Sequence, residues 1–229
     1  LRFSLRSAFL LFFLGSFSGL IWAQTPTTSP ATEYANALVL FQTGVYQRAY
    51  EAFRAFEQQN PDHPNAAESH YYQAEALLAL GKTQEAAPLY ASFANRYPNH
   101  PFGEKAHMVL GQYYFEQEEY AKSRSAFGGV FQNQKDPELA AEALYWMGLN
   151  SLRLNEADIA LDYFEQTYIR YPNTQIAPQA LYLVGKTELE RKNYARASEH
   201  FDLLATRYPL SDFTGKTALA SMEANFELG

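Results

Sequence analysis

The sequence predicts an all-α solenoid of antiparallel helix pairs, because one pattern recurs five times at a period of 37 residues. Three columns of this repeat are in register. The first is small and reads Ala37, Ala74, Gly111, Gly148 and Gly185. The second, also small, reads Ala49, Ala86, Ser123, Ala160 and Ala197. The third is aromatic and reads Phe53, Tyr90, Phe127, Phe164 and Phe201. Repeats of this length stack on one another and bury a continuous core.

The first 23 residues have the layout of a secretory signal peptide. Arg2 and Arg6 form a basic start, residues 8–22 are uncharged and mostly apolar, and Ala23 offers a cleavage site. The alternative is an uncleaved membrane anchor, although about fifteen apolar residues are few for a span of ~20. In both cases we expect the rest of the chain to be exported.

A short polar linker is expected at 24–31, followed by a single solenoid domain over 32–229. The expected repeats are approximately 32–64, 65–101, 102–138, 139–175 and 176–211, with a partial sixth copy at 212–229. The last copy stops where its first helix would end. Its outward positions stay apolar, at Leu219, Met222, Phe226 and Leu228. This pattern favours the front part of a longer repeat protein, and the alternative is a capping helix.

The fourth copy shows how one unit folds. Apolar residues recur at three- and four-residue steps over 138–154, which predicts an amphipathic helix. Asn155 ends it, because asparagine readily adopts the left-handed conformation. A second helix is expected over 156–170, and it stops at Tyr171 because a residue before proline avoids the helical region. The unit is therefore a helical hairpin.

The columns have physical roles in this hairpin. Gly148 and Ala160 are expected where the two helices cross, and Phe164 fills the space between hairpins. A proline column closes each copy except the third, where Lys135 stands in that position. We therefore expect a slightly longer connection at 132–136.

Charge and composition restrict the classes of function. The chain carries 18 basic and 25 acidic residues, a net charge of −7. Loss of residues 1–23 removes two arginines and no acid, which leaves 16 − 25 = −9. An acidic surface repels phosphate backbones, so nucleic acid is not an expected partner. Membrane association is expected only through an uncleaved N-terminal segment. The sequence contains no cysteine, which excludes disulfides and thiolate chemistry.

No motif of catalysis, metal binding or cofactor binding stands out. His63 and His100 are one period apart, as are His70 and His107, so duplication of the repeat explains their spacing. No helix pairs them at the i, i+4 spacing that a zinc site favours. There is no glycine-rich phosphate loop and no nucleophile elbow. We expect a protein that is not an enzyme and has no metal and no cofactor.

The spacing of small, small, aromatic and proline positions resembles that of tetratricopeptide (TPR) repeats. Gly148, Ala160, Phe164 and Pro172 show it, and the fifth copy repeats it. The resemblance covers 32–209 and implies a right-handed superhelix of about five and a half repeats that binds other proteins. The usual repeat has 34 residues, and the extra ones here fall between hairpins.

The lengthened form is similar to exported bacterial repeat proteins, namely the Tol–Pal system coordinator and the repeat lipoprotein of the outer-membrane assembly machine. The chain departs from the second in having no lipid-accepting cysteine. It departs from the first in having no trimerising coiled coil before the repeats. The resemblance implies a protein-binding scaffold of the bacterial cell envelope, located in the periplasm, whose partners are envelope proteins or peptides.

TPR solenoids bind partners on the concave face formed by first helices, and the resemblance implies such a groove here. The residues expected to point into it are Tyr34, Tyr71, Met108, Tyr145 and Tyr182. The alternative is that this column only packs neighbouring helices. If it lines a groove, replacing Tyr71 and Tyr145 by alanine should weaken binding and leave the melting temperature little changed.

Charged residues of the same groove are mixed in sign. They are Lys105, Arg153 and Lys186, with Glu116 and Glu190. Some TPR domains hold a C-terminal carboxylate with a lysine, but the tyrosine column occupies that lysine's position, so this mode is not expected. Two other functions remain open: a TPR adaptor at the N-terminus of a larger envelope enzyme, and a membrane-anchored, chaperone-like periplasmic protein.

Overall fold

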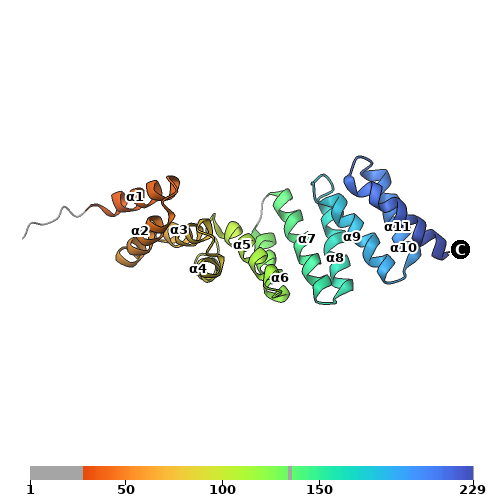
Figure 1. Ribbon diagram of the computed structural model, residues 1–229, viewed down its shortest axis with the longest axis horizontal. Coiled ribbons are helices and arrows are strands. Elements are labelled where there is room, and N and C mark those ends of the chain that lie inside the picture. Colours follow the sequence, from red (N-terminus) through yellow and green to blue (C-terminus); the bar gives the residue numbers. More distant parts are fainter. Residues whose placement is uncertain (1–27, 134–135, 229) are drawn as a thin grey trace, which may run out of the picture.

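The computed structural model describes residues 28–133 and 136–228, which form eleven helices and no strand. The helices follow one another along an elongated stack (Figure 1). Their bounds are α1 Pro30–Gln42, α2 Tyr46–Gln59, α3 Ala66–Ala79, α4 Thr83–Arg96, α5 Gly103–Glu116, α6 Tyr120–Asn133, α7 Pro137–Arg153, α8 Ala157–Arg170, α9 Ala177–Glu190, α10 Tyr194–Arg207 and α11 Asp212–Leu228. The predicted all-α solenoid is confirmed. The predicted signal peptide and residues 24–27 of the predicted linker lie outside the described residues, and Pro30 and Ala31, assigned to the linker, belong to α1.

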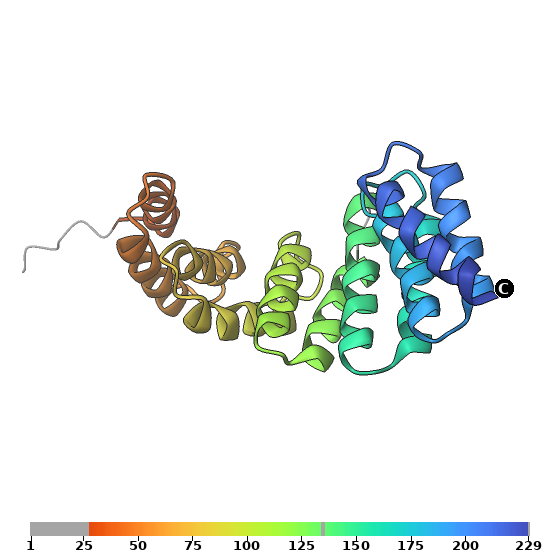
Figure 2. The ribbon, with the colours of Figure 1, turned by 45° about the vertical axis from the view of Figure 1, so that its right-hand side comes forward.

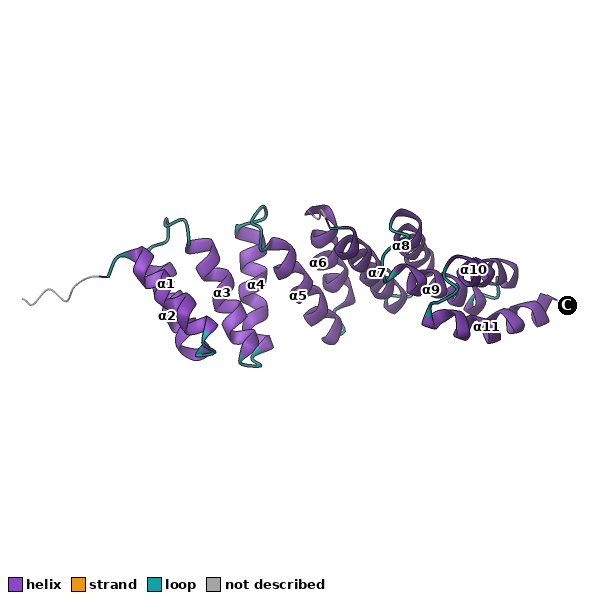
Figure 3. Cartoon of the chain, turned by 90° about the horizontal axis from the view of Figure 1, so that it is seen from above, coloured by secondary structure: helices purple, strands orange, loops and turns teal. Residues whose placement is uncertain are grey.

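Each helix packs against the next along the stack (Figure 3). We call the odd-numbered helices the first helices and the even-numbered ones the second helices. The stack is curved, and α1, α3 and α5 lie on the inner side of the curve (Figure 2). The face formed by the first helices is called the inner face below.

The small and aromatic columns meet inside each hairpin. The alanines of both small columns, from Ala37 to Ala197, are fully buried, as are the aromatic rings opposite them. A Cβ atom added to Gly148 would lie 2.5 Å from Phe164, and one added to Gly185 would lie 2.5 Å from Phe201. The aromatic ring therefore rests directly on the backbone of the first helix, and a side chain at the glycine would have to displace it.

Each of the five turns within the hairpins contains one residue in the left-handed backbone conformation. Gly44 and Gly81 have φ angles of 79° and 74°, and Asn155 has 61°. Glu118 and Lys192 adopt the same conformation, with φ angles of 60° and 63°. Side chains other than glycine and asparagine rarely occur there, because the Cβ atom approaches the carbonyl oxygen. Two of the five turns are therefore strained.

Replacing Lys192 by glycine should stabilise the protein. The left-handed conformation costs an ordinary residue roughly 1–2 kcal/mol, and the greater flexibility of unfolded glycine returns roughly 0.5–1 kcal/mol. The expected net gain is about 0.5–1 kcal/mol, a rise of about 2 °C in melting temperature for a chain of this size. The converse variant, Gly81→Ala, meets no atom within 4 Å and should lose about 1 kcal/mol. Thermal melts of both variants check this, and a Lys192→Gly protein no more stable than wild type contradicts it.

His63 and His100, which lie one repeat apart, stabilise the loops between successive hairpins. Nδ1 of His63 accepts the backbone N–H of Asn65 at 3.1 Å, and Nδ1 of His100 accepts that of Phe102 at 3.2 Å. Each ring also lies edge-on against a core phenylalanine, Phe56 or Phe93, about one turn before its loop. Their repeat spacing therefore reflects a repeated turn structure.

The third connection differs from the prediction. Only three residues separate the end of α6 from Pro137, whereas six separate α2 from α3 and α4 from α5. The expectation of a longer connection at 132–136 is wrong. The reason is that α7 begins one turn early: Asp136 accepts the backbone N–H of Glu138, and Pro137 suits the first helical position.

A polar cluster joins the first two hairpins through Glu57 of α2. Its carboxylate accepts hydrogen bonds from His70 at 3.0 Å, Gln73 at 2.7 Å and Arg96 at 2.8 Å. Burial alone would raise the pKa of Glu57, but these hydrogen bonds together lower the pKa below its ordinary value of 4.5. The cluster thus favours the charged form of Glu57 in the folded state.

Neutralising this carboxylate with Glu57→Gln should destabilise the protein at neutral pH by about 1.5–3 kcal/mol, the usual worth of hydrogen bonds to a charged group. Because the folded pKa is lowered, the contribution of the charge is present above pH 4.5 and is lost as the pH falls through the folded pKa. The difference between wild type and variant in urea unfolding should therefore shrink between pH 7 and pH 3. Glu51→Gln, on the exposed side of the same helix, is the control. A difference that does not change with pH contradicts the prediction.

The last described helix keeps an uncovered apolar face. Met222 and Phe226 are 68% and 82% exposed, while the side chains of Leu219 and Leu228 lie outside the described part. That further repeats follow Gly229 stays a prediction. Among the described helices, none combines the length and the apolar character needed to cross a membrane.

Candidate binding groove on the inner face

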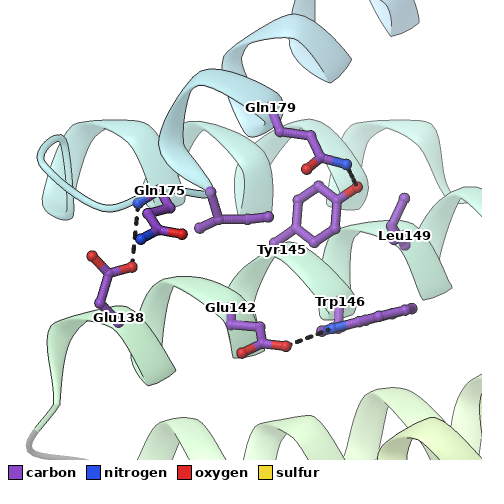
Figure 4. Close-up of a pocket in the computed structure, with 8 residues that line it drawn as sticks. Glu138, Glu142, Tyr145, Trp146, Leu149, Gln175 and Gln179 are labelled. Carbon is purple, nitrogen blue, oxygen red and sulfur yellow. Dashed lines mark hydrogen bonds between the residues drawn. The ribbon is translucent and has the colours of Figure 1, made fainter. Parts of the chain in front are cut away.

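Two pockets lie between neighbouring first helices. The first, here called the α7–α9 pocket, has a volume of about 530 Å³. It is lined by Glu138, Glu142, Tyr145, Trp146, Leu149, Gln175, Ile176 and Gln179 (Figure 4). The second, here called the α3–α7 pocket, has a volume of about 440 Å³ and draws its lining from α3, α5, the loop before α5, and Leu139 of α7. Glu138 lines the first pocket and its sequence neighbour Leu139 lines the second, so both pockets border the start of α7.

The tyrosine column is more buried than a set of free binding anchors would be. Tyr34, Tyr71 and Tyr145 are only 9%, 5% and 7% exposed. Tyr71 contacts the rings of Tyr90, Phe93 and Phe102, with centroids 4.5–5.8 Å away. Because both rings belong to the core, we expect alanine at 71 and 145 to lower the melting temperature, contrary to the expectation from the sequence.

The hydroxyl groups of two of these tyrosines connect successive repeats. The hydroxyl of Tyr34 donates to Glu68, and Nε2 of Gln179 donates to the hydroxyl of Tyr145 at 2.5 Å (Figure 4). Both partners lie 34 residues further along the chain, on the next first helix. Burial raises the pKa of Tyr34, Tyr71 and Tyr145. These side chains stay neutral at physiological pH.

Some of the residues predicted to line the groove do line the two inner-face pockets. Tyr71 and Met108 line the α3–α7 pocket together with Lys105, and Tyr145 lines the α7–α9 pocket. Tyr34 and Tyr182 line neither of the two inner-face pockets, and Tyr182 packs against Phe201 and Phe213. The tyrosine column thus packs the helices together and presents some of its edges to the inner face.

Two of the three predicted cations lie outside both pockets. Arg153 is exposed near the end of α7, and Lys186 forms an ion pair with Glu190 at 3.6 Å. The charges that do line the pockets are mostly acidic: Glu75, Glu104, Glu138 and Glu142, with Lys105 as the cation among them.

The sequence held a signal for two pocket residues that it did not single out, Glu142 and Gln179. The position three before each member of the tyrosine column lies one helical turn back on the same face, and in the last four copies it reads Glu68, Lys105, Glu142 and Gln179. Three of these four line an inner-face pocket, and Glu68 bonds Tyr34.

The carboxylates of the α7–α9 pocket are not neutralised within the described chain. Glu138 accepts the backbone N–H of Gln175 at 3.2 Å, and Glu142 accepts the indole N–H of Trp146 at 3.4 Å. Among the described residues, no lysine, arginine or histidine forms an ion pair with either of them. The pocket is therefore an acidic site with an apolar wall of Tyr145, Trp146, Leu149 and Ile176.

Nothing in the described part of the chain is arranged as a metal site. No group of three or more histidine, aspartate or glutamate side chains is placed there to hold an ion. His70 hydrogen bonds Glu57, and burial lowers the pKa of His107, whose ring lies against the backbone of Gly129. Both histidines are thus packed between helices.

Comparison with protein families finds tetratricopeptide repeats. The tetratricopeptide-repeat family matches residues 108–174 and 147–212. A second match, to the family described as anaphase-promoting complex, cyclosome, subunit 3, covers residues 21–93. Comparison of the sequence with curated proteins gave no match.

Solved structures with the same fold are distant in sequence. A tetratricopeptide repeat protein from Parabacteroides merdae has a TM-score of 0.61 and 20% identity, covering 87% of this chain and 73% of that one. MamA from Desulfovibrio magneticus RS-1 has a TM-score of 0.58 and 18% identity, covering 81% and 98%. Pseudomonas aeruginosa pilF has a TM-score of 0.52 and 16% identity, covering 87% and 90%. At such identities the likeness establishes the fold alone.

Proposed function

We propose that this chain, a tetratricopeptide-repeat solenoid, is a non-catalytic scaffold that binds segments of partner proteins along its inner face. Solenoids of this kind present extended surfaces that other chains follow. The observation that supports the proposal is the pair of pockets between first helices, both of which border the start of α7. They offer apolar walls and polar rims, the combination that holds a peptide segment.

Site-specific photo-crosslinking tests where a partner binds. A benzophenone side chain at Met108 lies in the α3–α7 pocket, whereas one at Ile169, 59% exposed on the second helix α8, lies away from it. The two proteins are irradiated in envelope extract, and crosslinked proteins are identified by mass spectrometry. Proteins captured from Met108 and not from Ile169 support binding on the inner face. Equal capture at both positions, or none at either, argues against it.

We further propose that the scaffold acts in the periplasm of a bacterial cell envelope. The support is the basic and apolar N-terminal layout of residues 1–23 together with the acidic, cysteine-free remainder. Alkaline phosphatase is active only after export, so a fusion behind Gln24 reports the location. Activity that disappears when residues 1–23 are deleted supports export, and the mass of the mature chain shows whether cleavage occurs after Ala23. A fusion that is inactive with the segment in place contradicts the proposal.

A further inference from the structure

We propose that the α7–α9 pocket takes an arginine side chain of the partner segment. This inference rests on the proposed function, because it names the chemistry of the segment that the inner face would bind. Three observations support it. Two glutamates, Glu138 and Glu142, line the pocket. Apolar side chains lie beside them, and no described lysine, arginine or histidine forms an ion pair with either glutamate.

Neither carboxylate has a cationic partner among the residues that the structure describes. Glu138 and Glu142 are four residues apart on α7; the carboxylate of Glu138 is directed toward Gln175 and that of Glu142 toward Trp146 (Figure 4). Like charges at this spacing repel each other. Their hydrogen bonds come from neutral groups, a backbone N–H and an indole N–H. A cation that entered the pocket would reduce the repulsion and would offer a charge-assisted hydrogen bond to a carboxylate.

The apolar lining of the pocket determines which kind of cationic group would fit it. Leu149, Ile176 and the rings of Tyr145 and Trp146 provide apolar surface next to the carboxylates. A side chain with an apolar stem and a charged head covers such a wall while its head meets the acids. The guanidinium group fits better than an ammonium group, because it is planar and stacks on aromatic rings such as those of Tyr145 and Trp146 while its donors meet a carboxylate.

The α3–α7 pocket would hold another part of the same partner segment. The α3–α7 pocket is lined by Leu78, Met108, Val109 and Leu139, with Glu75 and Glu104 at its polar edge. It suits an apolar side chain, and its carboxylates outnumber its one cation, Lys105. The partner segment is therefore expected to be basic and to carry an apolar residue near the arginine.

Peptide selection on the purified chain tests the inference. The probe is a displayed library of random twelve-residue peptides. The strongest binders are then synthesised with each arginine replaced by citrulline, which keeps the shape and removes the charge. Arginine should be enriched in the selected peptides, and one citrulline replacement should weaken binding at least tenfold. The variant Glu138→Gln/Glu142→Gln should weaken the arginine peptide to a similar extent, and the citrulline peptide much less.

The matched control removes the same charge elsewhere. Glu199→Gln/Asp202→Asn changes two exposed acids of the second helix α10, and it should alter affinity less than twofold. Failure to select any peptide would contradict the proposed function, and with it this inference. Binders without arginine enrichment, or binders indifferent to both citrulline and Glu138→Gln/Glu142→Gln, would overturn the inference while supporting a peptide-binding inner face.

Discussion

Replacing Gly148 by leucine should lower the free energy of unfolding by about 3 kcal/mol or more. A single Cβ atom at this position would lie 2.5 Å from the ring of Phe164, which is itself fully buried. Leucine adds three further carbon atoms to that contact, so the ring or the whole second helix α8 has to move. Overpacking of a filled core costs typically 1–3 kcal/mol and occasionally more. Urea unfolding followed by circular dichroism measures the loss.

The control for this prediction is a glycine of the neighbouring hairpin that has room. A Cβ atom on Gly128, within α6, would meet only the end of the Met147 side chain, at 3.9 Å. Gly128→Ala should therefore be neutral, or stabilising by up to about 1 kcal/mol through helix propensity. A Gly148→Leu protein as stable as wild type would show that α7 and α8 do not pack as closely as described.

Replacing Tyr145 by alanine should destabilise the protein by about 3–5 kcal/mol, the range for deleting a large buried aromatic side chain. The ring is 7% exposed and contacts Trp146 and Phe164, with centroids 6.2 and 5.9 Å away. In a solenoid each repeat contacts only its neighbours, so the loss should concentrate in the hairpins around α7. Hydrogen exchange resolved by segment, together with a thermal melt, measures both the size and the place of the effect.

Tyr145→Phe separates packing from hydrogen bonding at this position. Phenylalanine keeps the ring and removes the hydroxyl that Gln179 contacts. The expected loss is about 1 kcal/mol, the usual net worth of one hydrogen bond. If alanine at 145 melted at the wild-type temperature, the ring would not belong to the core, and the tyrosine column would be free to act as a row of binding anchors.

The sequence by itself determined the architecture. Gly148 and Ala160 could be assigned to a helix crossing because small residues recur at their positions in all five copies, and such a constraint applies wherever the same contact is repeated. The turn at Asn155 was also readable, because its local conformation depends on the residue itself. Both inferences rest on local rules that hold within one hairpin.

The tertiary structure decided how the hairpins meet and what their inner face presents. The sequence alone could not tell whether Tyr145 faces a ligand or the core, because both alternatives place it on the same side of the helix. Its burial depends on the ring of Phe164 and on Gln179 of the next repeat. The hydrogen bond from Gln175 to Glu138 likewise depends on the neighbouring hairpin. Periodicity reports which residues share a face, but the angle and spacing between hairpins determine which of them are covered and which remain in a pocket.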